Sequence, residues 1–456
     1  MSEYMVRRKN KLIFLCLDLL SIVVAYLLAF YFRFDGFPER NINSFITLLP
    51  WILMISVLFL SVYELYNVKR RSNWELLRDI IVANTFIVFI TMSFSFLFRE
   101  FALPRTIIII TFFLTIFLMM AWRIVYLKFT THKKVEKIIL FGNKKDLGKI
   151  VVDFKKTIPG QIDINCVDND KYDELTEELI KEADMIAISQ DIPKPFKTKI
   201  IYEAVSKSKT VYIIPTAYEL LLTRASITSI DDSMVLSVKP FGLSFDQQLI
   251  KRFFDIIFSI FSIVLLSPLF ILAILLVKFE SPSGPIFYGQ KRLGKYNKEF
   301  TIKKFRTMVV DAEKYTGPIL ATSDDVRITK SGKFLRMTRI DELPQLFNVL
   351  KGDMAIVGPR PEREIFIKEY EEKHEGYQYR NTVKPGITGV AQVMGKYSTS
   401  VEDKLRYDLY YIRNYSIWLD FLLLLRTIIV VLDKTKSEGN KKTKKIKRSR
   451  MNKKII

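Results

Sequence analysis

Four long apolar runs occupy the first part of the chain and constrain its fold more than any other feature. Each run is close to the roughly 20 residues that a helix needs to cross the hydrocarbon core of a bilayer. Four such runs in succession argue against buried helices of a soluble protein. The first run lacks a small-residue cleavage site, so we expect an anchor rather than a removable signal peptide. The sequence therefore predicts a four-helix transmembrane unit over residues 1–132, with runs at about residues 12–32, 46–66, 80–98 and 106–127.

Basic residues in the connections between the runs predict the orientation of this unit. They concentrate between the second and third runs and after the fourth, whereas the other two connections carry fewer basic residues, partly offset by acidic ones. Basic loops of membrane proteins stay preferentially in the cytoplasm. We therefore expect both ends of the unit and the soluble domains after it to be cytoplasmic. The residues behind this prediction are Lys69, Arg70, Arg71, Arg78, Lys128, Lys133 and Lys134.

The formal net charge of +22 is compatible with nucleic acid, a membrane surface or phosphorylated substrates as partners. Much of the charge flanks apolar segments or falls in residues 434–456, which we predict to be a disordered polybasic tail attracted to anionic membrane lipids. No aromatic residues for base stacking accompany this tail, so nucleic acid is not expected as a partner. Two cysteines and two well-separated histidines supply neither a disulfide framework nor a zinc-binding pattern.

Residues 133–246 alternate strand and helix patterns, which is typical of a small doubly wound, Rossmann-like α/β domain. The first expected strand ends at Gly142, and the next glycine is Gly148. The G-x-G-x-x-G loop of a dinucleotide site is therefore missing, and we favour a structural or regulatory role. The expected strands are residues 137–141, 163–167, 184–189 and 211–214.

A further apolar run at residues 253–277 is interrupted by Ser267 and Pro268. Proline kinks a helix, and the serine hydroxyl can bond a carbonyl that the kink frees. Basic residues flank both ends, so both ends are expected on the cytoplasmic side. We therefore predict a re-entrant helix that anchors a mainly α-helical domain over residues 247–433, with a straight fifth span as the alternative. The shorter apolar stretch at 418–432 is predicted to be an interfacial or packed helix.

Acidic and basic residues gather in four clusters after Gly284. In the third cluster, Asp341 and Glu342 precede an apolar helical pattern that Gly352 can end. Carboxylates at a helix start are favoured in their charged form. An ionised aspartate can attack phosphorus, and a neighbouring glutamate can hold Mg²⁺. An Asp-Glu pair at a helix start is usually structural, but the density of Lys and Arg around this one favours phosphate chemistry.

These motifs resemble the bacterial sugar transferases, the monotopic phosphoglycosyl transferases. The resemblance covers residues 247 to about 432. The four-helix unit and the α/β domain that precede this region resemble those of long family members that initiate capsule or exopolysaccharide synthesis. It rests on the Ser-Pro break, GPIFYGQKRLG, KKFRTM, DDVRITKSGKFLRMTRIDELPQLFNVLKGDMAIVGPRPE, and KPGITGVAQV at 384–393.

The resemblance implies a membrane enzyme of the bacterial cytoplasmic membrane that acts in two steps. Asp341 would attack the β-phosphate of a UDP-sugar and release UMP, and the phosphosugar would then pass to undecaprenyl phosphate. Glu342 would bind Mg²⁺, and Ser267 and Pro268 would form the re-entrant break. The residues carried over as phosphate-contacting groups are Lys304, Arg306, Arg336 and Arg360, each of which could instead be a solvated charge or the partner of an acid.

The resemblance leaves the sugar open, with glucose favoured over galactose, and leaves the oligomeric state open, with a homo-oligomer among the options. One rival is a membrane-anchored nucleotide-sugar dehydratase or epimerase, which would need a glycine-rich NAD loop and a Tyr-x-x-x-Lys pair, and the sequence contains neither. Another rival is a non-enzymatic scaffold of polysaccharide assembly, which would not need Asp341 and Glu342 among phosphate-binding residues.

Overall fold

The computed structural model describes residues 3–66, 72–98, 103–130, 136–143, 147–148, 150–151, 162–167, 174–310, 312, 325–396 and 399–433. The chain divides into two compact units, and the boundary between them in the sequence lies between Ile214 and Pro215. The polybasic tail, Lys69 to Arg71, Lys133 and Lys134 lie outside the described residues, so the predictions for them are untested. The domain boundaries predicted at residues 132, 246 and 433 also stay predictions.

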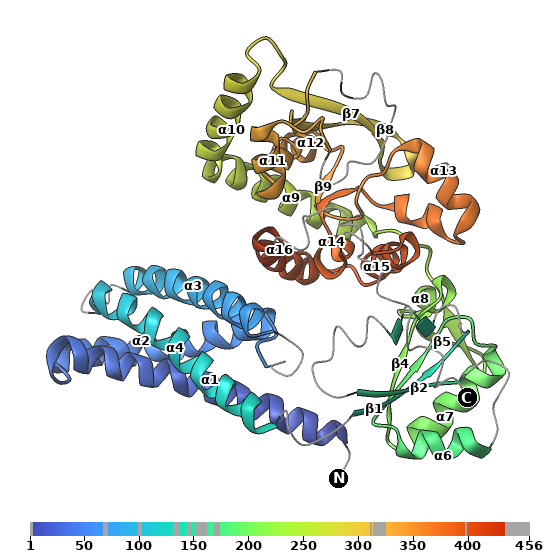
Figure 1. Cartoon of the computed structure of the whole chain (residues 1–456), viewed down its shortest axis with the longest axis horizontal. Helices are drawn as coiled ribbons and strands as arrows, with labels where there is room; N and C mark the ends of the chain where they lie inside the picture. The colour runs from blue at the N-terminus through green and yellow to red at the C-terminus, as the bar shows by residue number, and fades with distance from the viewer. Residues whose placement is uncertain are drawn as a thin grey trace. The chain divides into compact units, whose positions relative to one another are not determined.

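Four long helices form the first part of unit one, as the apolar runs predicted (Figure 1). All four are long and apolar enough to cross a bilayer. Helix α1 packs along α4, and α2 packs along α3. Between α1 and α4, the buried guanidinium of Arg123 donates two hydrogen bonds to the carboxylate of Asp18, at 2.8 and 2.7 Å, so each charge has a partner of opposite sign inside the bundle. The helices are α1 (Glu3–Phe34), α2 (Glu39–Val62), α3 (Asn73–Leu97) and α4 (Arg105–Thr130).

A four-stranded parallel sheet in the order β2-β1-β3-β4 follows in the chain. Apolar side chains pack on both faces of β1 and β3, with Ile139 and Ile186 in one cluster and Ile138 and Met185 in another. Burial on both faces explains why these strands read as continuous apolar runs. The predicted doubly wound domain is confirmed. Its elements are β1 (Glu136–Phe141), β2 (Ile162–Val167), α6 (Glu174–Glu182), β3 (Met185–Ile188), α7 (Lys194–Ser206) and β4 (Thr210–Ile213).

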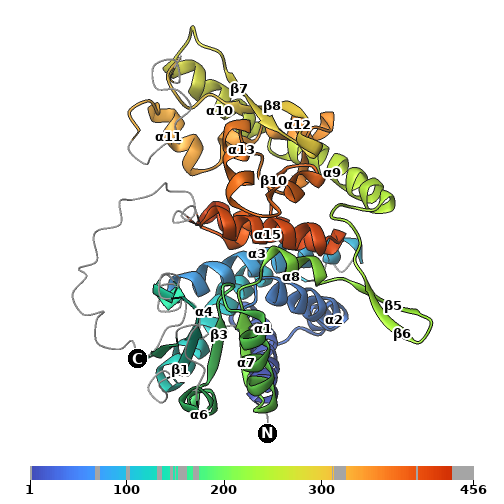
Figure 2. The ribbon, with the colours of Figure 1, turned by 90° about the vertical axis from the view of Figure 1, so that its right-hand side faces the viewer.

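Unit two is mainly helical, as predicted, and it also contains three small two-stranded sheets. The pairs β5–β6 and β7–β8 are antiparallel hairpins, and β9 pairs with β10 in parallel. The β5–β6 hairpin extends away from the helices of its unit (Figure 2). The elements before residue 306 are α8 (Ala217–Leu222), β5 (Ser226–Ile230), β6 (Ser233–Ser237), α9 (Phe245–Leu265), α10 (Ser267–Glu280), β7 (Phe287–Leu293), η2 (Lys295–Asn297) and β8 (Glu299–Phe305).

The remaining elements surround a core to which β9, α12, α14, α15 and α16 contribute. Helix α16 is packed against this core, since Asp420 is fully buried and accepts hydrogen bonds from Lys251 at 2.7 Å and Tyr411 at 2.8 Å. The elements are α11 (Lys330–Met337), η3 (Ile340–Glu342), α12 (Gln345–Lys351), β9 (Ala355–Val357), α13 (Glu364–Lys373), η4 (Tyr377–Thr382), β10 (Gly386–Thr388), α14 (Val390–Met394), α15 (Val401–Arg413) and α16 (Ile417–Leu432).

The predicted break in the fifth apolar run is present. Helices α9 and α10 meet at Leu266 with a bend of 62°. The Ser267 hydroxyl donates to the carbonyl of Val264 at 2.8 Å, which satisfies one carbonyl that the kink frees, as expected. Large apolar side chains such as Phe253, Val264 and Ile271 are exposed along both arms. This exposed apolar surface suits a lipid environment rather than water.

Candidate active site

Asp341 and Glu342 lie in the short 3-10 turn η3 between α11 and α12. Arg339 has a left-handed backbone conformation, with φ of 57°, and reverses the chain direction after α11. Helix α12 begins only at Gln345, after Pro344. The prediction that the two carboxylates begin the helix is therefore wrong by about one turn, because the proline displaces the helix start. Gly352 ends α12 in a left-handed conformation, as predicted.

Two cations from distant parts of the chain hold the carboxylate of Glu342. Lys304 Nζ on β8 and Arg360 Nη2 each lie 2.8 Å from Glu342 Oε1. Arg339 Nη1 lies 3.8 Å from the second oxygen, Oε2. Glu342 is 8% exposed, so its charge is removed from bulk water and needs these partners. Lys304 and Arg360 therefore take the alternative role that the sequence left open, as partners of an acid, and their contact with phosphate stays a prediction.

The neighbouring carboxylate of Asp341 is held differently. Asp341 is 7% exposed, yet its side chain accepts no hydrogen bond and makes no ion pair with any described residue. Its oxygens are also absent from the fully enclosed, unpartnered polar atoms of the described chain. Asp341 is therefore a recessed carboxylate that still has an open approach. Cations surround it without binding it directly, since Lys304, Arg336 and Arg360 all act on its charge.

The two carboxylates differ sharply in acidity. Burial raises the pKa of Asp341 to about 6, and the charge of Glu342 adds to that rise while Lys304 and Arg336 oppose it. Burial also acts to raise the pKa of Glu342, but the charges of Arg360 and Lys304 outweigh it and hold that pKa well below its usual value. At Asp341, burial thus outweighs the stabilisation of the ionised form that was expected from the helix start. Adjacent acids with separated pKa values are suited to different roles.

The turn that carries Asp341 rests directly on the second arm of the bent helix pair. Ile340, the residue before Asp341, is buried with Ala273 and Val277 of α10, together with Phe305 and Leu335. The apolar helix pair and the turn that carries Asp341 therefore share one hydrophobic cluster.

The loop that presents Arg360 is fixed by backbone packing against the KPGITG segment. The Gly358 N–H donates to the Thr388 carbonyl at 2.8 Å, and the Gly386 N–H donates to the Pro359 carbonyl at 2.9 Å. A Cβ on Gly386 would lie 2.1 Å from the Gly358 nitrogen, so only glycine permits this approach. Gly358 and Gly386, one from each motif, therefore together permit the close backbone approach.

A buried arginine, Arg380, stabilises the same loop through a hydrogen bond to its backbone. Arg380 donates to the backbone carbonyl of Arg360 at 2.8 Å, to Asp408 at 2.9 Å and to the hydroxyl of Tyr377 at 2.7 Å. Sequence reasoning did not single out Arg380, because nothing near it in the chain marks it. Arg339 was also missed, although it lies inside the RMTRIDELPQ motif, three residues before Glu342.

The other two predicted phosphate ligands have different positions. Arg336 donates from Nε to the Thr307 hydroxyl at 2.8 Å and influences Asp341 through its charge. Arg306 is turned to the Ser281 carbonyl at 3.2 Å and packs on Gly284, where an added Cβ would overlap its guanidinium. Arg306 makes no hydrogen bond or ion pair with Asp341 or Glu342, so its predicted phosphate contact gains no support from its placement.

A metal ion would find two carboxylates at this site. Among the described residues, no group of three or more His, Cys, Asp and Glu side chains could form a metal centre. Mg²⁺ commonly binds one or two carboxylates and completes its shell with water and substrate phosphates. Glu342 Oε1 is taken by Lys304 and Arg360, whereas Glu342 Oε2 has only the 3.8 Å contact with Arg339. Glu342 Oε2 is therefore the carboxylate oxygen that is left to hold a Mg²⁺ ion of this kind.

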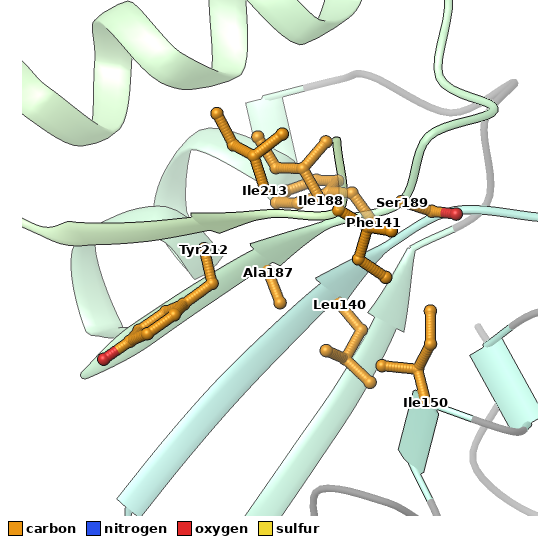
Figure 3. A pocket seen from close by; sticks show the side chains of 9 residues that line it. Leu140, Phe141, Ile150, Ala187, Ile188, Ser189, Tyr212 and Ile213 are labelled. Atoms are coloured by element: carbon orange, nitrogen blue, oxygen red, sulfur yellow. The ribbon is translucent and has the colours of Figure 1, made fainter. Parts of the chain in front are cut away.

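The α/β domain contains a separate pocket at the carboxyl ends of β1, β3 and β4 (Figure 3). Doubly wound domains bind ligands at this edge. The pocket volume is about 110 Å³, well below the roughly 300 Å³ at which ligand pockets usually begin. Its lining is almost wholly apolar and offers a diphosphate few donors, which favours the structural or regulatory interpretation. The lining residues are Leu140, Phe141, Ile150, Ala187, Ile188, Ser189, Tyr212, Ile213 and Ile214.

Comparison with known proteins identifies the second unit. A family model described as bacterial sugar transferase matches residues 246–434. An N-acetylgalactosaminephosphotransferase of Aeromonas hydrophila that acts with UDP-N-acetylgalactosamine and undecaprenyl phosphate is 42% identical over 225 residues, which is 49% of this chain and 52% of that protein. The UDP-glucose:undecaprenyl-phosphate glucose-1-phosphate transferase of Escherichia coli K12 is 36% identical over 236 residues, half of each chain.

These matches span about half the length of the two larger relatives. The uncharacterised sugar transferase EpsL of Bacillus subtilis is shorter. It is 42% identical over 195 residues, which is 43% of this chain and 92% of EpsL. With four candidate membrane spans and a bent apolar helix pair before the Asp341 turn, this membrane protein belongs to the bacterial sugar transferase family.

Proposed function

We propose that this protein transfers a hexose-1-phosphate from a UDP-sugar to undecaprenyl phosphate and releases UMP. The observation that carries the proposal is the recessed, unpaired carboxylate of Asp341, surrounded by Lys304, Arg336 and Arg360 and joined to α10. Relatives of known activity carry undecaprenyl-phosphate sugar transfer in their names. The reaction would be the first membrane step of capsular or exopolysaccharide synthesis.

The proposed reaction consists of two displacements at one phosphorus atom. In the first, an Asp341 oxygen forms a bond to the β-phosphorus, and the bond from that phosphorus to the bridging oxygen breaks, so UMP leaves with the bridging oxygen. In the second, an oxygen of the lipid phosphate attacks the same phosphorus and displaces Asp341. The product is a lipid diphosphate sugar, and the carboxylate is regenerated. Covalent catalysis divides the exchange into two easier steps.

The surrounding residues support this chemistry without a general base. With a pKa of about 6, Asp341 is largely ionised at neutral pH. Lys304, Arg336 and Arg360 would neutralise phosphate oxygens as charge shifts during each displacement. Glu342 Oε2 would be the protein ligand of Mg²⁺, which supplies further shielding of the diphosphate when bound. Because Glu342 is strongly acidic, it stays available as an anionic ligand throughout the neutral range.

The membrane geometry follows from the bent helix pair. We propose that α9 and α10 enter the bilayer and return to the cytoplasmic face, with Ser267 and Pro268 at the turn. The basic residues that flank the pair and the exposed apolar side chains along both arms support this arrangement. Asp341 would then lie near the headgroup level, where a cytoplasmic UDP-sugar and the phosphate of a membrane lipid both have access.

The sugar is the least constrained part of the proposal. The names of the relatives include N-acetylgalactosamine, glucose and galactose. We take UDP-glucose as the first substrate to test and UDP-galactose as the second. The direct experiment incubates membranes containing the protein with undecaprenyl phosphate and a panel of UDP-sugars, and measures UMP and lipid-linked sugar.

The matched control for this experiment is Asp341→Asn, which keeps the shape of the side chain and removes its charge. Membranes with the unaltered protein are expected to form UMP and lipid product from one UDP-sugar, and Asp341→Asn membranes are expected to contain the protein but form neither. A non-enzymatic scaffold would give no UMP with any sugar, and that result would refute the proposal.

A further inference from the structure

Three basic side chains meet at the carboxyl end of α12, on a surface that the proposed reaction does not use. Arg252 of α9 donates to the carbonyls of Val349 at 2.5 Å and Leu350 at 2.7 Å. A Cβ on Gly352 would lie 3.5 Å from Lys384 Nζ and 3.6 Å from an Arg252 nitrogen, so both cationic groups converge on this glycine.

Lys295 extends the same group along α9. Its ammonium donates to Gln248 Oε1 at 2.9 Å, one helical turn before Arg252. The three residues come from three separate segments: α9, the turn between β7 and β8, and the KPGITG motif. Arg252, Lys295 and Lys384 are called the α12-end basic cluster below.

The acidic side chains close to this cluster already have other partners. Asp255 accepts the Ile356 N–H at 3.0 Å and faces Lys251 at 3.5 Å. Asp353 pairs with Lys351 at 3.1 Å. Lys384, which is half-buried, makes no hydrogen bond or ion pair with any described residue. Partial removal of an unpaired ammonium group from water is costly unless an anion accompanies it.

The charges of the cluster act on one another. Burial lowers the pKa of Lys384, the charge of Arg252 lowers it further, and Lys295 adds to the effect, while Asp255 and Asp353 oppose it. Asp255 and Asp353 also have other partners, so neither is dedicated to neutralising Lys384. A bound anion would relieve both the repulsion between the cations and the desolvation of Lys384.

The neighbouring surface of α9 indicates where such an anion comes from. Leu249, Ile250 and Phe253 are 55%, 56% and 69% exposed, beside Arg252 on the same helix. The basic cluster thus adjoins exposed apolar side chains of α9. Basic side chains at such a border reach the headgroups of anionic lipids. A soluble nucleotide has no acyl chains that could cover the adjoining apolar surface.

We propose that the α12-end basic cluster binds the phosphate of an anionic bilayer phospholipid and so fixes the depth of α9 in the membrane. The inference needs only that α9 enters the bilayer, whether the α9–α10 pair re-enters or crosses. It does not depend on sugar transfer by Asp341, so its failure and the failure of the proposed function would be seen in different assays.

The test measures phosphatidylglycerol bound to the purified full chain by native mass spectrometry, with phosphatidylcholine as the zwitterionic reference. We expect Lys384→Gln and Lys295→Gln each to weaken phosphatidylglycerol binding about fivefold, as for removal of one basic residue near a membrane surface. The double variant is expected to lose preference over phosphatidylcholine at this site. The basic tail is present in every variant, so its contribution cancels.

Two matched controls make the result decisive. Lys368→Gln removes the same charge from α13, where Lys368 is exposed and paired with Glu364, and it is expected to leave lipid binding unchanged. Lys384→Arg keeps the charge and is expected to keep the lipid. Unchanged phosphatidylglycerol binding in the double variant would overturn the inference, as would equal weakening in either control. Loss of undecaprenyl phosphate binding with phosphatidylglycerol binding intact would also overturn it.

Discussion

The pKa of Asp341 predicts how the first displacement depends on pH. The attacking group must be ionised, and burial raises its pKa to about 6. Activity is therefore fully present well above pH 6 and is lost as pH falls through 6. If the rate follows the ionised fraction, UMP release at pH 5 should be about tenfold slower than at pH 8. An aspartate with an ordinary pKa would lose almost nothing over this range.

The assay measures UMP release in a single turnover without the lipid acceptor. The ionisation of the lipid phosphate then plays no part, and the UDP-sugar diphosphate remains fully ionised across the range. Lys304→Gln sharpens the test, because Lys304 lowers the pKa of Asp341. Its removal should move the loss of activity to higher pH. A midpoint near pH 4, or a midpoint that stays fixed in Lys304→Gln, would refute the reasoning.

Three further predictions follow from the site. Asp341→Asn should raise the melting temperature at pH 7.5, since ionised Asp341 is disfavoured by about two pKa units, at most about 3 kcal/mol. The gain should fall to about half at pH 5 and vanish only below about pH 4, where Asp341 is protonated in both the folded and the unfolded chain; differential scanning fluorimetry of detergent-solubilised protein measures both. Gly386→Ala should lower the melting temperature and the rate of UMP release together, because its methyl group would collide with the Gly358 backbone. Removal of Mg²⁺ with EDTA should abolish UMP release and added Mg²⁺ should restore it, and full activity in EDTA would remove the metal role assigned to Glu342.

The membrane helices, the α/β domain and the kink could be predicted from the sequence because each produces a distinct pattern of apolar residues. The membrane helices follow from long apolar runs, and the central α/β strands from short continuous apolar runs such as the one ending at Phe141. The kink between α9 and α10 follows from Pro268, since proline inside an apolar run kinks or breaks a helix. The β5–β6 hairpin was not expected, and its strands are almost wholly exposed, so no burial pattern marks them.

The active site was only partly readable. Glu342, Lys304 and Arg360 were singled out through motifs, as a metal ligand and two phosphate-contacting groups. Their pairing with one another was only an open alternative, because spacing alone does not bring residues 304, 342 and 360 together. The acidity of Asp341 was misjudged, since burial depends on Ile340 and the α10 cluster beneath it. The place of Arg306 was also unforeseeable, because its guanidinium turns away to Gly284 and Ser281 through tertiary packing.

The central claim is that the Asp341 carboxylate becomes covalently bonded to the transferred phosphosugar. The most direct test incubates the purified full chain with its UDP-sugar in the absence of undecaprenyl phosphate, quenches rapidly with acid, and locates the adduct by peptide mass spectrometry. We expect one hexosyl phosphate on the peptide that contains Asp341. This adduct should be lost when undecaprenyl phosphate is added, and it should be absent in Asp341→Asn. An adduct on any other residue, or sugar transfer by Asp341→Asn at the normal rate, would contradict it.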